Sequence, residues 1–229
     1  MLKNPRLAIL VFLLSLVVLG EHGAQVGKPQ SVETAPGTFV VDAFEQHSYG
    51  KLPANWRSAG NGAEHVYRIE AEGDNRFLHA RAENRGTQIG LEYVFDPKKL
   101  QHLRWRWRVR ALPVGADERV GEKHDAAAQV YVIFDNQYWP RIIKFTWSTA
   151  VPVGSRFTHP LYHRARVVVL RSGPPDKSGW YEEKVNFYAE YKKFFGTEPG
   201  QVQGIALLTS SDSTKSLAAA DYDDFVLVP

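Results

Sequence analysis

The chain has 229 residues, with 28 Lys and Arg against 25 Asp and Glu, 8 His and no Cys, and its formal net charge is +3. Hydrophobic residues make up 44% and charged residues 23%, a balance typical of a folded domain rather than a disordered chain. The lack of cysteine excludes disulfide bonds, thiol catalysis, cysteine-bound zinc, iron–sulfur clusters and a lipid-modified cysteine.

The N-terminal segment has the pattern of a secretory signal peptide. Lys3 and Arg6 precede an uninterrupted apolar run over residues 7–19, and small residues follow it. As a helix this run rises only about 20 Å, short of the roughly 30 Å hydrocarbon core of a bilayer. We therefore predict a signal peptide over residues 1–20 and a periplasmic or secreted protein. The alternative is an uncleaved anchor, which would be the only contact with a membrane.

The remainder of the chain has the pattern of an all-β domain. Residues 21–37 are rich in Gly, Pro, Gln and Ser and are predicted to form a spacer, so the domain spans residues 38–229. Alternating or β-branched runs between turn residues predict strands over residues 39–43, 66–71, 77–82, 88–95, 103–111, 127–134, 141–147, 166–171, 202–209 and 222–228. One short helix is predicted over residues 187–195, ending at Gly196. This pattern predicts an antiparallel two-sheet sandwich with one short helix.

The predicted strands over residues 103–111, 127–134 and 141–147 each have an apolar side and a polar side. Trp105 and Trp107 alternate with four arginines, so the two tryptophans are predicted to lie in the core together with Trp147. If the three strands are neighbours, their polar sides form one patch that contains Arg106, Arg108, Asp125, Gln129, Tyr131 and Lys144.

Short motifs in a fixed order resemble the bacterial domain-of-unknown-function family 3047 over nearly the whole chain after the signal segment. They are Trp105-Arg106-Trp107, Asp125-Ala126-Ala127, residues 130–134, Phe145-Thr146-Trp147, residues 168–173, Trp180, Tyr191, Phe195-Gly196, residues 204–209, Asp212-Ser213-Thr214 and Tyr222-Asp223-Asp224. The resemblance implies an exported jelly-roll sandwich of the galactose-binding or carbohydrate-binding type, and it implies no particular activity.

The candidate ligand-binding residues are of three kinds. Arg106, Arg108 and Lys144 offer positive charge, and guanidinium groups in a row match the carboxylates or sulfates of an anionic chain. Asp125, Gln129 and Asp212 offer polar contacts for hydroxyl groups, and Tyr131 and Trp139 offer rings that can stack on sugars. The alternative for the arginines is a solvated face on which acids of neighbouring strands pair with them.

A structural calcium ion is a further expectation that follows from the resemblance. In jelly-roll modules the first and last strands often lie side by side and share a calcium ion, which here would be bound by Asp42 and Asp224. Calcium needs several oxygen ligands. The alternative is that these acids cap strand ends and shield a sheet edge.

No catalytic motif stands out in the sequence. There is no nucleophile elbow, metal-binding helix or phosphate-binding loop, and His124, His159 and His163 are predicted to be surface residues. The leading hypothesis is an exported, non-catalytic domain that binds a glycan or another cell-envelope ligand on one sheet face. The second is a hydrolase or lyase of envelope polysaccharides that uses Asp125, Glu183 or Asp212, and the third is an envelope protein-interaction domain. Nucleic acid is not expected as a partner because the net charge is small.

Overall fold

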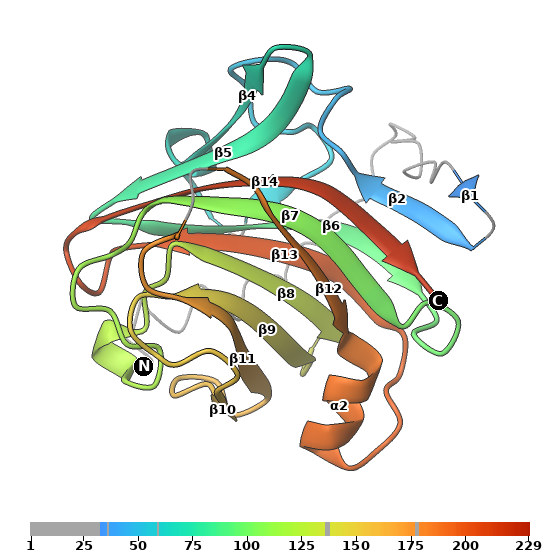
Figure 1. Cartoon of the computed structure of the whole chain (residues 1–229). Coiled ribbons are helices and arrows are strands. Elements are labelled where there is room, and N and C mark those ends of the chain that lie inside the picture. The colour runs from blue at the N-terminus through green and yellow to red at the C-terminus, as the bar shows by residue number, and fades with distance from the viewer. Residues whose placement is uncertain (1–32, 36, 59, 136–137, 177–178) are drawn as a thin grey trace.

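The computed structural model describes residues 33–229, except residues 36, 59, 136–137 and 177–178, and consists of two stacked β-sheets (Figure 1). We call them sheet A and sheet B. Sheet A contains β1 (Glu33–Ala35), β2 (Thr38–Asp42), β14 (Leu217–Val228), β5 (Asn75–Glu83) and β4 (Tyr67–Glu72), with β7 (His102–Ala111) and β12 (Tyr181–Asn186). Sheet B contains β10 (Arg156–Thr158), β11 (Ala165–Ser172), β9 (Arg141–Ser148), β8 (Ala128–Phe134), β13 (Val202–Ser210), β6 (Gly86–Phe95) and β3 (Arg57–Ser58), in that order. The described helices are η2 (Ala63–His65), η3 (Gly121–Lys123) and α2 (Phe187–Phe195).

The predicted jelly-roll sandwich is confirmed. The long strand β14 lies at the centre of sheet A, where it pairs with β7 along one side and with β5 and then β2 along the other. Strand β2 therefore lies beside the last strand of the chain, with Asp42 opposite Phe225 (Figure 1). This pairing brings the two ends of the domain together in one sheet.

One pairing departs from the antiparallel prediction. Strands β9 and β11 run parallel, with Lys144 opposite Val167, because the chain between them passes through the edge strand β10 before it returns. Parallel strands need such a crossover connection, whereas antiparallel strands can be joined by a tight turn. The rest of sheet B is antiparallel.

The core between the sheets is aromatic, and the prediction for its three tryptophans is confirmed. Trp105, Trp107 and Trp147 are all buried, and the rings of Trp105 and Trp107 meet edge to face at 5.2 Å between centroids. Trp105 also stacks on Phe225 of β14 at 6.3 Å. Such aromatic pairs contribute roughly 0.5–1.5 kcal/mol beyond the burial of their surface. The alternation in β7 therefore fixes which face of sheet A is buried.

Helix α2 has the bounds that the sequence predicted. Asn186 caps its first turn by accepting a hydrogen bond from the Ala189 amide at 2.7 Å, and Gly196 ends it with φ of +66°. Phe187 and Tyr191 are its buried residues. Strand β12, directly before it, was not predicted because Glu183 points inward between Tyr181 and Val185 and hides the alternation.

Among the described residues, no helix is both long and apolar enough to cross a membrane. The predicted signal peptide over residues 1–20 lies outside the described residues, as does most of the predicted spacer, although β1 falls within the spacer.

Candidate functional site

Polar side chains gather on the outer face of sheet B, which is the face turned away from the core. On β8, Val130 and Val132 belong to the core between the sheets, so Gln129 and Tyr131 point outward. Opposite them on β9 lie Thr146 and Lys144. With residues from the adjoining connections they form what we call the polar cluster, namely Glu118, His124, Asp125, Gln129, Tyr131, Lys144, Thr146, His159 and Asp212.

Lys144 lies at the centre of the cluster and is fully buried. Its ammonium group has no hydrogen-bond partner, and it lies 5.9 Å from the centroid of the Tyr131 ring. Burial lowers the pKa of Lys144 to about 8, although the charges of Glu118 and Asp125 oppose this shift. A buried ammonium without a partner is costly, because it has lost its hydration without gaining a hydrogen bond.

The carboxylates near Lys144 accept hydrogen bonds from other donors. Glu118 accepts hydrogen bonds from the Thr146 hydroxyl at 2.9 Å and the Ser148 hydroxyl at 2.5 Å. Asp125 Oδ2 accepts from the Thr214 amide at 2.7 Å and the Thr214 hydroxyl at 2.9 Å, whereas its Oδ1 is buried without a partner. Two buried polar groups of the cluster thus have no hydrogen-bond partner: the donor Lys144 Nζ and the acceptor Asp125 Oδ1.

Gln129 and Tyr131, by contrast, form a closed hydrogen-bond chain. The Tyr131 hydroxyl donates to Gln129 Oε1 at 2.7 Å, and Gln129 Nε2 donates to the Ala126 carbonyl at 3.2 Å and to Ser210 Oγ at 3.1 Å. Burial raises the pKa of Tyr131 well above its ordinary value, so this phenol stays protonated. These two residues act as a rigid support for the cluster.

His124 and Asp212 form the half-exposed rim of the cluster. Burial raises the pKa of Asp212, and the neighbouring Asp125 carboxylate raises it further. The close approach of Asp212 depends on Gly86, because a Cβ atom there would lie 2.9 Å from Asp212 Oδ1 and 2.8 Å from the Ser210 Cβ. Burial and the charge of Lys144 lower the pKa of His124.

Two segments meet beside the cluster and contribute its histidines. The His124 and His159 rings contact each other at 5.7 Å between centroids, and a Cβ atom on Gly121 would lie 3.0 Å from Leu161 Cδ2. Burial lowers the pKa of His159 to about 2, with smaller contributions from Lys144 and His124. The prediction that the three histidines are surface residues is therefore wrong for His159, which is buried, and holds for the exposed His163.

A sequence profile described as "Protein of unknown function (DUF3047)" matches residues 54–226. The chain belongs to the DUF3047 family. No curated protein matches the sequence.

Solved structures share part of the fold of this DUF3047 protein at low sequence identity. The carbohydrate recognition domain of Emp47p is 10% identical with a TM-score of 0.44, and the match covers 88% of this chain and 97% of that one. A thermostable cellulase derived from Cel12A of Rhodothermus marinus is 12% identical with a TM-score of 0.41, and the match covers 77% of this chain and 97% of that one. The glycoside hydrolase domain of Endo-D from Streptococcus pneumoniae R6 is 9% identical with a TM-score of 0.34; the match covers 76% of this chain but only 21% of that one. At these TM-scores the likeness does not indicate what this DUF3047 protein binds.

The predicted single patch is wrong, because β7 lies in sheet A while β8 and β9 lie in sheet B. Asp125, Gln129, Tyr131, Lys144 and Asp212 come together in the polar cluster. Arg106 and Arg108 lie on the other sheet.

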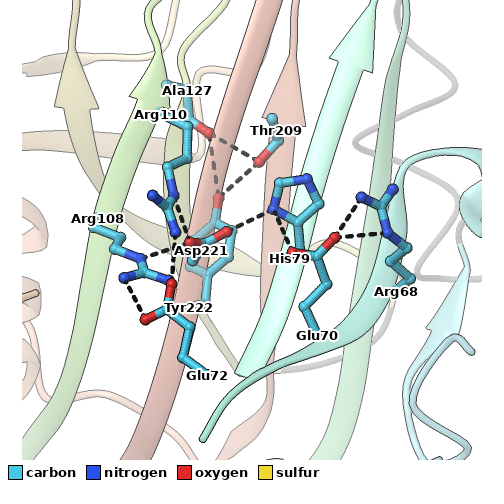
Figure 2. A network of polar contacts seen from close by, with 10 residues as sticks. All are labelled: Arg68, Glu70, Glu72, His79, Arg108, Arg110, Ala127, Thr209, Asp221 and Tyr222. Carbon is cyan, nitrogen blue, oxygen red and sulfur yellow. Dashed lines mark hydrogen bonds and ion pairs between the residues drawn. The ribbon is translucent and has the colours of Figure 1, made fainter. Parts of the chain in front are cut away.

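Both arginines are paired with acids, as the alternative of cross-strand pairing expected. Arg108 donates to Asp221 Oδ2 at 2.6 Å and to both oxygens of Glu72 at 2.9 and 2.6 Å. Arg106 pairs with Asp223 at 2.7 Å and with Asp224 at 2.8 Å. Figure 2 shows how this network continues from Asp221 through His79 and Glu70 to Arg68. These arginines bind sheet A together instead of presenting isolated charges.

Trp139 lies apart from the polar cluster, in the hairpin that joins β8 to β9. Its side chain is 68% exposed and that of Tyr138 is 61% exposed. The backbone beneath them is held, because Arg164 Nε donates to the Trp139 carbonyl at 3.0 Å and the Tyr162 hydroxyl donates to the Pro140 carbonyl at 2.8 Å. Tyr138 and Trp139 are therefore largely exposed beside a backbone that these two hydrogen bonds hold in place.

The predicted calcium ligands do not fit a metal site in this structure. Asp42 accepts hydrogen bonds from the Trp56 indole, His47 Nε2 and the Phe44 amide, each at 2.8 Å, whereas Asp224 pairs with Arg106. Within residues 33–229, leaving out the gaps given above, no three His, Asp or Glu side chains are grouped to hold a metal ion. The calcium site stays a prediction.

Sequence reasoning missed Glu118, His124 and His159 as members of the cluster. Glu118 lies in the connection between β7 and β8, where no periodicity indicates which side chains are buried. Glu183, a predicted catalytic candidate, lies elsewhere, accepting a hydrogen bond from Trp107 Nε1 at 3.1 Å and pairing with Arg171 at 2.5 Å.

Proposed function

We propose that this protein is an exported domain that binds an acidic glycan, a sugar chain with carboxylate or sulfate groups, through the polar cluster. The observation that carries this proposal is the fully buried ammonium of Lys144 without a hydrogen-bond partner. An anionic group satisfies such an ammonium through charge-assisted hydrogen bonds, which are roughly twice as strong as neutral ones.

The neighbouring groups favour a sugar over a simple anion. Lys144 Nζ makes no hydrogen bond to either neighbouring carboxylate, since Glu118 accepts from two hydroxyl groups and Asp125 Oδ2 accepts from Thr214. Asp125 Oδ1 is a buried acceptor that needs a donor. A sugar unit that carries both a carboxylate and hydroxyl groups supplies the acceptor for Lys144 and the donor for Asp125.

Access to Lys144 requires a local movement. His124 and Asp212 are half-exposed, whereas Lys144 is closed off from solvent. The segments that carry η3 and His159 contact each other beside the cluster, and η3 buries none of its own residues. Few buried contacts make a segment easy to open. Ligand entry through this side requires the connection that carries η3, which also contains the buried Glu118 and Asp125, to move away from the His159 segment.

Tyr138 and Trp139 offer a second contact for the same ligand class. Exposed aromatic rings stack on the C–H faces of sugars, and an anchored backbone lowers the entropy lost on binding. Stacking does not depend on ligand charge. The hairpin is therefore expected to contribute equally to the binding of acidic and neutral glycans, whereas Lys144 contributes only to acidic ones.

The test is isothermal titration of the mature chain with oligomers of a uronic acid and, in parallel, of a neutral glucose polymer of the same length. Lys144→Met keeps the length and most of the apolar surface of the side chain but removes the ammonium. Lys51→Met, at an exposed lysine, is the control for net charge. Trp139→Ala tests the hairpin.

We expect Lys144→Met to weaken binding of the uronate by at least tenfold, about 1.4 kcal/mol, and to leave binding of the neutral oligomer unchanged. Lys51→Met should leave both unchanged, and Trp139→Ala should weaken both alike. Equal binding of acidic and neutral oligomers by the wild-type chain, or unchanged uronate binding by Lys144→Met, overturns the proposal.

A further inference from the structure

The rim of the polar cluster places two proton-transferring groups beside Lys144. His124 and Asp212 are near enough for each charge to influence the pKa of the other, and the charge of Lys144 acts on His124. Both side chains are half-exposed, in contrast to the buried Lys144. This inference rests on the proposed function, because it concerns what happens to an acidic glycan bound at Lys144.

The hydrogen bonds of His124 identify which of its nitrogens can accept a proton. His124 Nδ1 lies 2.8 Å from the Gly121 carbonyl oxygen, which can only accept, so Nδ1 carries the hydrogen. In the neutral ring Nε2 then holds a lone pair. Because burial and Lys144 lower the pKa of His124, the ring is neutral near pH 7 and can act as a base.

His159 cannot take this role. Its Nδ1 accepts a hydrogen bond from the Leu161 amide at 3.2 Å, so in the neutral ring Nε2 carries the hydrogen and has no free lone pair. The two histidines therefore have opposite tautomers, and only His124 is a candidate base.

Asp212 is suited to hold a proton. Burial and the neighbouring Asp125 carboxylate both raise the pKa of Asp212, so this carboxyl holds a proton more readily than an isolated aspartate does. Of the two, Asp212 is the half-exposed residue, so it is the one that can pass a proton to a ligand.

Direct hydrolysis of a glycosidic bond fits these groups poorly. It uses two carboxyl groups on opposite sides of the bond, roughly 5–10 Å apart. Asp125 and Asp212 lie directly beside each other, and each oxygen of Glu118 accepts a hydrogen bond from a hydroxyl group. A base, an acid and a cation are instead the three groups that β-elimination requires.

We propose that the polar cluster cleaves an acidic glycan by β-elimination at a uronic acid unit, with His124 as the base, Asp212 as the acid and Lys144 bound to the uronate carboxylate. His124 Nε2 removes the proton on C5, next to the carboxylate, and the C–H electrons form a C4=C5 double bond. The C4–O bond breaks, and the departing oxygen takes the proton of Asp212. Lys144 stabilises the negative charge that develops on the carboxylate during proton removal. No water is consumed, and His124 and Asp212 regain their starting states by proton exchange with solvent.

The experiment incubates the full mature chain with polymers of mannuronate, guluronate, galacturonate and glucuronate and follows the ultraviolet absorbance of the new double bond. Mass spectrometry identifies the unsaturated products. His124→Gln keeps an amide donor for the Gly121 carbonyl but removes the base, and Asp212→Asn removes the acid. His65→Gln, at an exposed histidine outside the cluster, is the matched control.

We expect at least one polymer to yield unsaturated products, with turnover lowered at least 100-fold in His124→Gln, in line with the usual contribution of a general base. Titration calorimetry should show that His124→Gln binds the same uronate within about threefold of the wild-type affinity, and His65→Gln should match the wild type in both assays. Uronate binding without unsaturated products overturns the elimination and leaves the binding proposal standing. Saturated oligosaccharides as products also overturn it, and absence of uronate binding overturns both proposals.

Discussion

The buried ammonium of Lys144 leads to a prediction about stability that needs no ligand. Burial lowers its pKa from 10.5 to about 8, so the folded chain holds this proton less tightly than the unfolded chain does. One pKa unit corresponds to 1.36 kcal/mol, so burying the charged form of Lys144 lowers the free energy of unfolding by roughly 3 kcal/mol. This destabilisation is fully present below pH 8. It is relieved as the pH rises from about 8 to 10.5, because the unfolded state binds more protons in that window.

Lys144→Met removes the charge and should therefore make the chain more stable near neutral pH. We expect a gain of up to roughly 3 kcal/mol at pH 7, or about 6–12 °C in Tm for a domain of this size. The gain should shrink to well under 1 kcal/mol by pH 10.5, because wild-type Lys144 is then neutral in the folded state and only half protonated in the unfolded state.

Urea unfolding at a series of pH values between 7 and 10.5 measures this directly, with Lys51→Met as the control whose stability follows the wild type throughout. A Lys144→Met chain that is no more stable than the wild type at pH 7 refutes the reasoning. So does a stability difference that stays constant across the pH series.

Three other changes test separate parts of the structure. Arg108→Met leaves buried Asp221 without one of its guanidinium partners and should cost about 2 kcal/mol in urea unfolding; unchanged stability would show that the network in Figure 2 contributes little. Gly86→Ala places a Cβ atom 2.8 Å from the Ser210 Cβ and should cost about 1–3 kcal/mol, whereas an unchanged Tm would contradict the close approach of Asp212. Gly196→Ala forces a side chain onto a φ of +66° and should cost about 1 kcal/mol; circular dichroism and thermal unfolding measure it, and equal stability would contradict the cap.

The core was predictable because it depends on alternation within single strands. Trp105 and Trp107 alternate with charged residues, and a period of two places them on one face whatever the strand's neighbours are. Helix α2 was predictable for a similar local reason, since Gly196 follows its last turn directly.

Sheet membership was not predictable, because pairing joins segments far apart in the sequence. Nothing within β7 indicates that it pairs with β14 and β12 rather than with β8, so the arginines and Lys144 could be assigned to one patch. Lys144 in β9 also has the local pattern of a solvent-facing residue, with Ile143 and Phe145 on either side. It is buried because segments outside its strand cover the sheet. The alternation of residues within a strand does not indicate whether another segment covers that face.

The central claim is that the Lys144 ammonium binds an anionic group of the ligand, and its own titration tests this most directly. Nuclear magnetic resonance of lysine side chains can follow the pKa of Lys144 in the free chain and with a saturating uronate oligomer, using Lys144→Met to assign the signal. We predict a pKa of about 8 in the free chain and a rise of at least one unit, a tenfold change, when the uronate is bound. A pKa that is the same with and without the uronate would contradict the claim.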